Sequence, residues 1–247
     1  MRIGIDGRVL TDHYPGIGRA LYSVLPSLAT GRETIVLFRG PETESDRFPI
    51  PPLADSGIEI HRVSVGLRSI GEQVRPPATV QRPGLDVVLT PYFATSLRWP
   101  CPRVTMVHDL IPLTAGGGMT SPAKRLGYLL FLRSTLVRSR TIVTPSQATA
   151  DRLYRFAPGV RSRTRLIPNA VDPGARPRHR AEIDEVRRQC RLGRRHVLTV
   201  GGDRPHKNLA RLTDAWTTLD PNLRGDAVLA LVGSPPPRID HPTVRVL

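Results

Sequence analysis

The sequence is poor in cysteine and in aromatic residues, and each shortage narrows the classes of protein that fit it. Its 247 residues include two cysteines, Cys101 and Cys190, which lack the spacing of a zinc site or a CxxC redox motif. A disulfide-rich scaffold is therefore excluded, although a single disulfide between the two stays open. Aromatic residues make up 5% and do not alternate with basic ones, as a base-stacking groove requires. We therefore expect no metal site and no nucleic acid partner.

Long apolar runs are also missing. The most apolar stretch, Leu126–Val137, is too short to span a bilayer and contains Arg133. Residues Met1–Asp6 have the pattern of a buried strand rather than of a signal peptide. We therefore expect a cytoplasmic protein. Hydrophobic residues still make up 39% of the chain, which is enough for a globular core.

Acidic residues are outnumbered by basic ones. There are 36 Lys and Arg against 21 Asp and Glu, a formal net charge of +15, and only Lys124 and Lys207 are lysines. This excess favours anionic partners such as phosphorylated substrates or an acidic membrane surface. The arginines are spread along the chain, as in Arg161–Arg165 and Arg187–Arg195. Two interpretations stay open: Arg-rich solvated faces, or peripheral attachment to an anionic membrane surface at its inner face.

Short apolar segments alternate with helical patterns up to Ile167, and this alternation predicts an α/β fold with a mostly parallel sheet. The proline-rich segment Pro41–Pro52 is predicted as a loop. We expect helices at Ile17–Ala29, Pro122–Val137 and Ser146–Phe156, the last with Ser146 as its N-cap. We expect strands at Arg2–Asp6, Glu33–Phe38, Ile58–Val65, Asp86–Leu89, Val104–Val107, Thr141–Thr144 and Arg165–Ile167.

The composition changes after this region. Pro173–Arg195 is rich in proline and arginine and contains a predicted helix at Ala181–Cys190. A new βαβ unit then follows. We therefore expect two domains, residues 1–172 and residues 196–247, joined by a connecting segment of residues 173–195. A complete doubly wound domain needs roughly 100 residues or more, so we expect the second domain to be incomplete. Its predicted elements are His196–Val200, Asn208–Thr218, Ala227–Val232 and Thr243–Leu247.

Gly16 and Gly18 form the first candidate site. They open the first predicted helix, where glycine lets a ligand approach the backbone and free N–H groups attract phosphate. Leu21 occupies the place of the third glycine of a GxGxxG motif, so a dinucleotide site is weakly supported. A tight turn without a ligand is the alternative.

Two further candidate sites follow strands. His108 and Asp109 come directly after Val104–Val107, and ligands of parallel sheets bind at the carboxyl ends of strands. Arg204 and Lys207 lie in the Gly201–Asn208 loop between a strand and a helix, which is a suitable cradle for a diphosphate. The alternatives are a structural histidine and a basic surface turn.

Five segments, in this order, resemble the retaining GT-B glycosyltransferases of family 4. The resemblance covers nearly the whole chain, and each motif alone is loose. The segments are Gly16-Ile17-Gly18-Arg19, His108-Asp109-Leu110-Ile111-Pro112, Thr144-Pro145-Ser146, Ile167-Pro168-Asn169-Ala170-Val171-Asp172, and Val200-Gly201-Gly202 through Lys207-Asn208-Leu209.

The resemblance implies a GT-B-like fold: a Rossmann-like N-terminal domain on the acceptor side and an incomplete second Rossmann-like domain. It implies transfer of a hexosyl group from a nucleotide-diphosphate sugar, without a cofactor, to a saccharide or lipid-linked acceptor. The donor would lie between the domains. Gly16, Gly18, Arg204 and Lys207 would bind it, and His108 and Asp109 would be the catalytic residues. The sequence Pro205-His206-Lys207-Asn208 is most similar to that of mannosyltransferase-like relatives.

The sequence also departs from the family pattern. Gly202 and His206 stand where many relatives carry arginine, and Arg204 would compensate. The family's motif of two glutamates about eight residues apart, late in the second domain, has no counterpart before Leu247. The alternative to an active transferase is therefore a truncated, non-catalytic remnant, or a partner half that binds an acceptor, a membrane or another protein.

Overall fold

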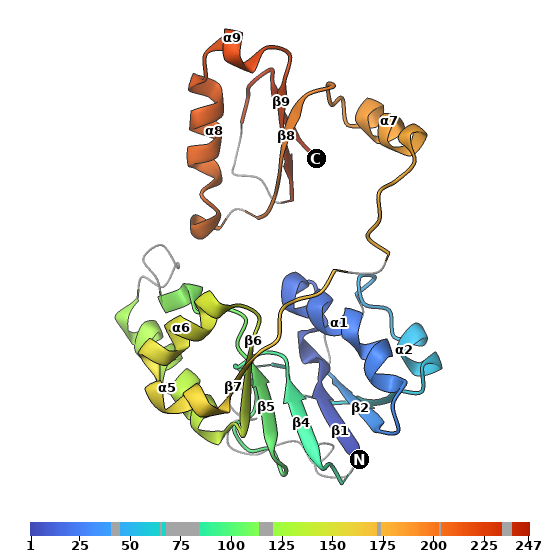
Figure 1. Cartoon of the computed structure of the whole chain (residues 1–247), viewed down its shortest axis with the longest axis vertical. Helices are drawn as coiled ribbons and strands as arrows, with labels where there is room; N and C mark the ends of the chain where they lie inside the picture. The colour runs from blue at the N-terminus through green and yellow to red at the C-terminus, as the bar shows by residue number, and fades with distance from the viewer. Residues whose placement is uncertain are drawn as a thin grey trace. The chain divides into compact units, whose positions relative to one another are not determined.

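The computed structural model describes residues 1–40, 45–64, 66–67, 84–113, 121–171, 174–202, 204–233 and 239–247. The chain divides into two compact units, one from residues 1–110 and 121–172 and the other from residues 111–120 and 173–247 (Figure 1). Each unit is built on a parallel β-sheet. Residues 172 and 173, where the sequence predicts the change from the first domain to the connecting segment, lie outside the described residues.

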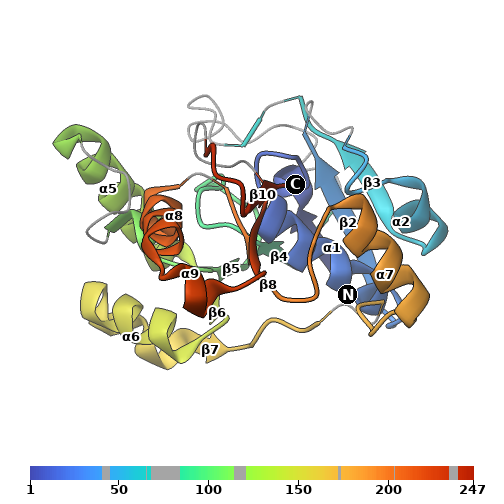
Figure 2. The same ribbon diagram turned by 90° about the horizontal axis from the view of Figure 1, so that it is seen from above.

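The first unit contains a seven-stranded sheet in the order β3-β2-β1-β4-β5-β6-β7. Figure 1 labels the strands from β2 to β7 in this order, and Figure 2 shows β3 beside β2. Its neighbouring strands run parallel; Ile3 of β1 lies opposite Ile35 of β2 on one side and Val87 of β4 on the other. The order reverses between β1 and β4, which makes that place the topological switch point of the sheet. The strands are β1 (Arg2–Asp6), β2 (Thr34–Arg39), β3 (Glu59–Arg62), β4 (Val87–Thr90), β5 (Arg103–Met106), β6 (Thr141–Thr144) and β7 (Thr164–Leu166).

Helices follow most of these strands. They are α1 (Pro15–Ala29), α2 (Pro51–Asp55), α5 (Pro122–Arg138) and α6 (Gln147–Phe156), with 3₁₀ turns η1 (Gly7–Val9) and η3 (Pro158–Arg163); the 3₁₀ turn η2 (Ile111–Leu113) belongs to the second unit. Leu21 and Leu25 of α1 belong to the same buried cluster as Ile35 and Leu37 of β2. Val36 and Phe38, which point to the opposite face of β2, belong to a second cluster. The sheet is therefore apolar on both faces, as a buried parallel sheet requires.

The predicted elements of this unit are confirmed, most to within two residues, and Ser146 caps α6 by accepting from the Thr149 amide at 3.2 Å. One prediction was wrong at its end. Pro51 and Pro52, assigned to a loop, begin α2, because proline is accommodated in the first turn of a helix, where its missing N–H has no intrahelical partner. Residues 41–44 of that predicted loop, and Val65 of the predicted third strand, lie outside the described residues.

The second unit contains a three-stranded parallel sheet in the order β10-β9-β8. Helix α8 runs beside β8 and β9 in Figure 1, and its Trp216 packs with Leu229 and Leu231 of β9. Strand β8 is an edge strand, and its Val197, Leu198 and Val200 are exposed. The elements are α7 (Arg180–Gln189), β8 (His196–Val200), η4 (Pro205–Lys207), α8 (Leu209–Thr218), α9 (Pro221–Arg224), β9 (Val228–Val232) and β10 (Val244–Val246).

Both cysteines are free thiols, so no disulfide joins Cys101 and Cys190. Across the described ranges, no helix is long and apolar enough to cross a bilayer. Within the same ranges, no three His, Cys, Asp or Glu side chains are grouped so that they could hold a metal ion.

Candidate functional site

The carboxyl ends of β1 and β4 meet at the switch point of the larger sheet, and a buried ion pair lies there. Asp6, the last residue of β1, accepts from Nε and Nη2 of Arg8, both at 2.8 Å, and from Oγ1 of Thr95 at 2.6 Å. The Asp6 and Arg8 side chains are 1% and 2% exposed. Burial raises the pKa of Asp6, but the charge and hydrogen bonds of Arg8 outweigh it and hold the pKa below its ordinary value. The hydrogen bond from Thr95 fixes the loop after β4 to the end of β1.

His108 is held by the same loop. Its Nε2 lies 2.9 Å from the carbonyl oxygen of Pro91, the residue after β4. Because a carbonyl oxygen only accepts, Nε2 carries the proton and the neutral ring keeps a lone pair at Nδ1. Burial lowers the pKa of His108, while the Pro91 hydrogen bond and the charge of Asp109 act in the opposite direction. At neutral pH the ring is therefore uncharged.

The backbone of His108 is tied to the next helix. Its carbonyl oxygen accepts from Oγ1 of Thr149 at 3.1 Å, and Thr149 also bonds to the N-cap residue Ser146. The segments that follow β4, β5 and β6 thus meet at His108, with Pro91 bonded to its ring and Thr149 to its backbone. Asp109 follows on the exposed surface.

Tyr128 of α5 belongs to the same neighbourhood. Burial, together with the negative charge of Asp109, raises its pKa, and Tyr92 acts in the same direction. Its hydroxyl is buried and has no hydrogen-bond partner within the described part of the chain. A buried hydroxyl without a protein partner is available to a bound ligand or to water.

The helix start that carries the two candidate glycines lies next to this loop. Tyr14, the N-cap residue of α1, contacts Tyr92 with ring centroids 5.5 Å apart, and Tyr92 follows Pro91. The structure therefore brings the start of α1 and the surroundings of His108 together within the first unit.

The two glycines differ in their surroundings. Gly16 is exposed, with nothing within 4 Å of where a Cβ would lie, so a ligand can approach its backbone. Gly18 is buried, and its amide donates to the carbonyl oxygen of Tyr14 at 2.7 Å. A Cβ on Gly18 would lie 2.7 Å from the ring of Phe48. Gly18 therefore has a packing role, and this role does not depend on donor binding.

The basic loop of the second unit lies at the start of α8. The side chains of Arg204, His206 and Lys207 are exposed, and none of these side chains has a hydrogen-bond or ion-pair partner among the described residues. The Lys207 side chain runs past Gly201, with its Cδ 3.8 Å from the Cβ position there. Asp203 of this loop lies outside the described residues.

Helix α8 adds uncapped backbone donors to these cations. Its N-cap residue Asn208 has a left-handed backbone, φ 53°, and its side chain makes no capping hydrogen bond. The first amide groups of the helix are therefore free of a side-chain acceptor, and the positive end of the helix dipole adds to the charge of Lys207. This combination favours an anion with several oxygens, such as a diphosphate.

Residues 16–175 match the family described as Glycosyltransferase Family 4. The chain belongs to this family. No curated protein matches the sequence.

Several solved structures share the fold. Anabaena HepE in complex with UDP-glucose matches with a TM-score of 0.67 and 15% identity, over 100% of this chain and 68% of HepE. HepE with UDP and glucose matches with a TM-score of 0.64 and 16% identity, over 95% and 61%. WaaG, a glycosyltransferase involved in lipopolysaccharide biosynthesis, matches with a TM-score of 0.61 and 14% identity, over 96% and 65%. The predicted GT-B-like fold is confirmed. The chain spans about 61–68% of the length of these structures.

Sequence patterns could not reveal two features of this family 4 chain. Asp6, Arg8 and Thr95 form no recognisable motif, because Thr95 reaches Asp6 only through the pairing of β1 with β4. Tyr128 looks like one more apolar position in its helix, and only the fold places its hydroxyl near Asp109. Among the predicted residues, Gly16, Gly18, His108 and Asp109 belong to the first unit, and Arg204 and Lys207 to the second.

Proposed function

We propose that this family 4 chain is a retaining glycosyltransferase that moves a hexosyl group from a nucleotide-diphosphate sugar to a saccharide or lipid-linked acceptor. The observation that carries the proposal is the cluster of exposed, unpaired cations at the uncapped start of α8. Family membership supports the reaction type. The HepE structures contain UDP or UDP-glucose, which supports a UDP-sugar as the first donor to test. The sequence of Pro205–Asn208 supports the finer proposal of a mannosyl donor. Turnover of GDP-mannose tests this proposal.

We assign the leaving diphosphate to Lys207 and Arg204. As the bond between the sugar and the diphosphate breaks, negative charge accumulates on the diphosphate oxygens. Fixed donors stabilise this charge best, because they need no reorganisation during the reaction. Lys207 contributes a point charge, and the first amide groups of α8 contribute aligned N–H donors. These groups can neutralise the leaving group without a metal ion.

We assign the donor sugar to His108. The Pro91 carbonyl fixes its ring, and the lone pair at Nδ1 can accept from a sugar hydroxyl. Its depressed pKa keeps the ring in this accepting form at neutral pH. Asp109, the second predicted catalytic residue, lies beside it on the exposed side. We assign Gly16, with its open backbone at the start of α1, to the donor phosphates, and Gly18 to the packing that positions Gly16.

Calorimetry with UDP and GDP tests the diphosphate assignment. We expect Lys207→Ala to weaken the binding of the preferred nucleotide by about tenfold to a hundredfold, since a hydrogen bond to a charged group contributes about 1.5–3 kcal/mol. Lys124→Ala is the matched control, because Lys124 is the other lysine and lies exposed on α5. Equal affinities of the two variants would refute the assignment of Lys207.

Turnover tests the assignment of His108. Release of free sugar, or its transfer, is measured with a panel of UDP- and GDP-sugars for the wild type and His108→Ala. We expect the variant to lose most of its turnover. Equal rates would remove His108 from the site.

The second candidate function is a non-catalytic remnant or partner half. The formal net charge of +15 favours it, because a basic surface suits an anionic acceptor or membrane. A wild-type chain that binds neither UDP nor GDP, and that hydrolyses no donor, would support this candidate over the transferase.

A further inference from the structure

The positive charge of the chain is concentrated in one part of the first unit. Residues 121–171 contain ten Lys and Arg side chains against the single carboxylate of Asp151, a net charge of +9 out of +15 for the whole chain. None of the salt bridges found in the described ranges involves a residue of this segment. This charge is therefore uncompensated by neighbouring carboxylates.

Part of it lines one pocket at the amino ends of β6 and β7, the edge opposite to His108 and Ser146. The pocket has a volume of about 590 Å³, and Arg138, Arg140, Arg163 and Arg165 line it with Ser139 and Ser162. The pocket depends on the fold, because β6 and β7 pair in parallel with Ile142 opposite Thr164. This register brings Arg140 and Arg165 to the same edge.

Three of these guanidinium groups are already oriented by the backbone. Nη1 of Arg138 donates to the carbonyl oxygen of Ser134 at 3.3 Å. Nη1 of Arg165 donates to the carbonyl oxygens of Ser162 at 2.9 Å and Thr164 at 3.0 Å. Nη1 of Arg163 donates to the carbonyl oxygens of Leu136 and Ser139 at the end of α5. The cap on α5 accounts for Nη1 of Arg163, but it does not account for the presence of four arginines around one pocket. Oriented guanidinium groups with N–H donors left over are suited to phosphate.

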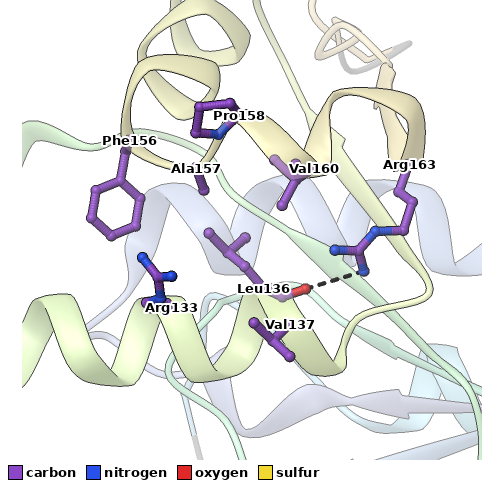
Figure 3. Close-up of a pocket in the computed structure, with 9 residues that line it drawn as sticks. Arg133, Leu136, Val137, Phe156, Ala157, Pro158, Val160 and Arg163 are labelled. Atoms are coloured by element: carbon purple, nitrogen blue, oxygen red, sulfur yellow. Dashed lines mark hydrogen bonds between the residues drawn. The ribbon is translucent and has the colours of Figure 1, made fainter.

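An apolar pocket adjoins the basic one. It has a volume of about 220 Å³ and shares Val137 and Arg163 with its neighbour. Figure 3 shows its apolar side chains: Leu136 and Val160 lie between the guanidinium groups of Arg133 and Arg163, and Phe156 lies beside Arg133. A phosphate site next to an apolar pocket is suited to an amphiphile.

We propose that these two pockets bind an anionic phospholipid, with its phosphate among Arg138, Arg140, Arg163 and Arg165 and the start of an acyl chain against Val137 and Phe156. Binding here is independent of the proposed transferase activity, because the residues lie at the other edge of the sheet. It would attach the first unit to an anionic membrane surface by a defined site rather than by diffuse charge.

The test compares two soluble probes that carry the same phosphomonoester: dihexanoyl phosphatidic acid below its micelle concentration, and glycerol 3-phosphate. Binding is measured by calorimetry on the full chain. We expect the lipid to bind at least about tenfold more tightly than glycerol 3-phosphate, since burial of only two methylene groups accounts for that factor. Equal affinities would overturn the lipid as the ligand.

Paired variants localise the phosphate. Arg140→Gln with Arg165→Gln removes two cations from the basic pocket, and Arg152→Gln with Arg155→Gln removes two exposed cations of α6 that line neither pocket. We expect about a tenfold rise in Kd for the first pair and less than about twofold for the second. The loop of Lys207 is unchanged in both, so phosphate bound there contributes equally. Equal losses, or no binding by the wild type, would overturn the site.

A third variant tests the apolar pocket. Val137 is 67% exposed, so Val137→Ser should fold normally. We expect it to weaken the lipid but not glycerol 3-phosphate. A circular dichroism melt confirms that each variant is folded, and Arg140→Gln alone serves if the first pair is not. Unchanged lipid affinity in Val137→Ser would contradict the placement of the acyl chain.

Discussion

The buried ion pair at the end of β1 allows a sharp prediction about stability. Asp6→Asn replaces the carboxylate that accepts from Arg8 at two oxygens and from Thr95 at one of them. An asparagine amide has one accepting oxygen, and its NH₂ group would face the N–H or O–H donors that now point at the second oxygen. The variant therefore leaves a buried guanidinium facing a donor instead of a negative charge.

The expected magnitude follows from burial. Removing one partner of a buried ion pair costs about 3–5 kcal/mol of unfolding free energy. The matched control is Glu59→Gln, because Arg2 and Glu59 are also 2.8 Å apart but are 37% and 41% exposed. A pair this exposed is screened by water and contributes about 0–1 kcal/mol. We therefore expect a difference of several kcal/mol between the two variants, although the two distances are equal.

Urea unfolding followed by tryptophan fluorescence measures this difference. The chain has two tryptophans, one in each unit, so a Trp216→Phe background leaves Trp99 as the reporter of the first unit. Trp99 donates to Oγ1 of Thr95 at 3.3 Å, directly beside the ion pair. If Asp6→Asn and Glu59→Gln lower the unfolding free energy by the same amount, the reasoning from burial is wrong.

The same pair predicts a pH dependence. The pKa of Asp6 is below its ordinary 3.8, so as the pH falls the unfolded state binds the proton first. The stabilisation by Asp6 is complete above pH 3.8 and is lost as the pH falls further towards the folded-state pKa. The free-energy difference between wild type and Asp6→Asn should therefore be constant at neutral pH and shrink below pH 3.8. A difference that grows on acidification would contradict this sign.

Two further predictions concern α1 and α6. Gly18→Ala should lower the unfolding free energy by about 1–3 kcal/mol, because its Cβ would lie 2.7 Å from the buried Phe48 ring, whereas Gly16→Ala meets nothing within 4 Å and should leave it unchanged or higher. Urea unfolding compares the two, and equal losses would refute the packing role of Gly18. Ser146→Ala should cost about 1 kcal/mol through the lost N-cap of α6, whereas Ser146→Asp should restore most of it. A loss that aspartate does not restore would point away from capping.

Local pattern and cap chemistry predict most of the fold. The apolar segments and the cap at Ser146 identify the elements, because a buried parallel strand needs a short apolar run and a helix start needs an acceptor. The wrong prediction of a loop at Pro51 has a local cause, because proline is typical both of loops and of the first turn of a helix. Asn208, predicted as the first residue of its helix, is its N-cap in a left-handed conformation. Both errors lie at element ends, where sequence signals are weakest.

The candidate site was predictable only where its residues follow strands directly. His108 and Lys207 could be proposed because the ends of parallel strands meet at one edge. The pairing of Asp6 with Thr95 spans 89 residues, and the Pro91 carbonyl that orients His108 has no side-chain signature. Such contacts arise from strand order, which local patterns do not encode. The sequence also could not distinguish Gly16 from Gly18, because their difference lies in the position of Phe48.

The spatial arrangement of the basic residues is a further feature that the sequence alone does not reveal. In the sequence, Arg140 and Arg165 are 25 residues apart and look like part of a dispersed arginine bias, yet the register of β6 and β7 brings them to one pocket. A bias in composition alone predicts that Arg140 with Arg165 and Arg152 with Arg155 contribute equally to anion binding, because each pair carries the same charge. A built site predicts unequal contributions, since only the first pair lines a pocket with three backbone-oriented guanidinium groups. The two double variants therefore decide between solvated arginine faces and a membrane-facing role, the interpretations that net charge leaves open.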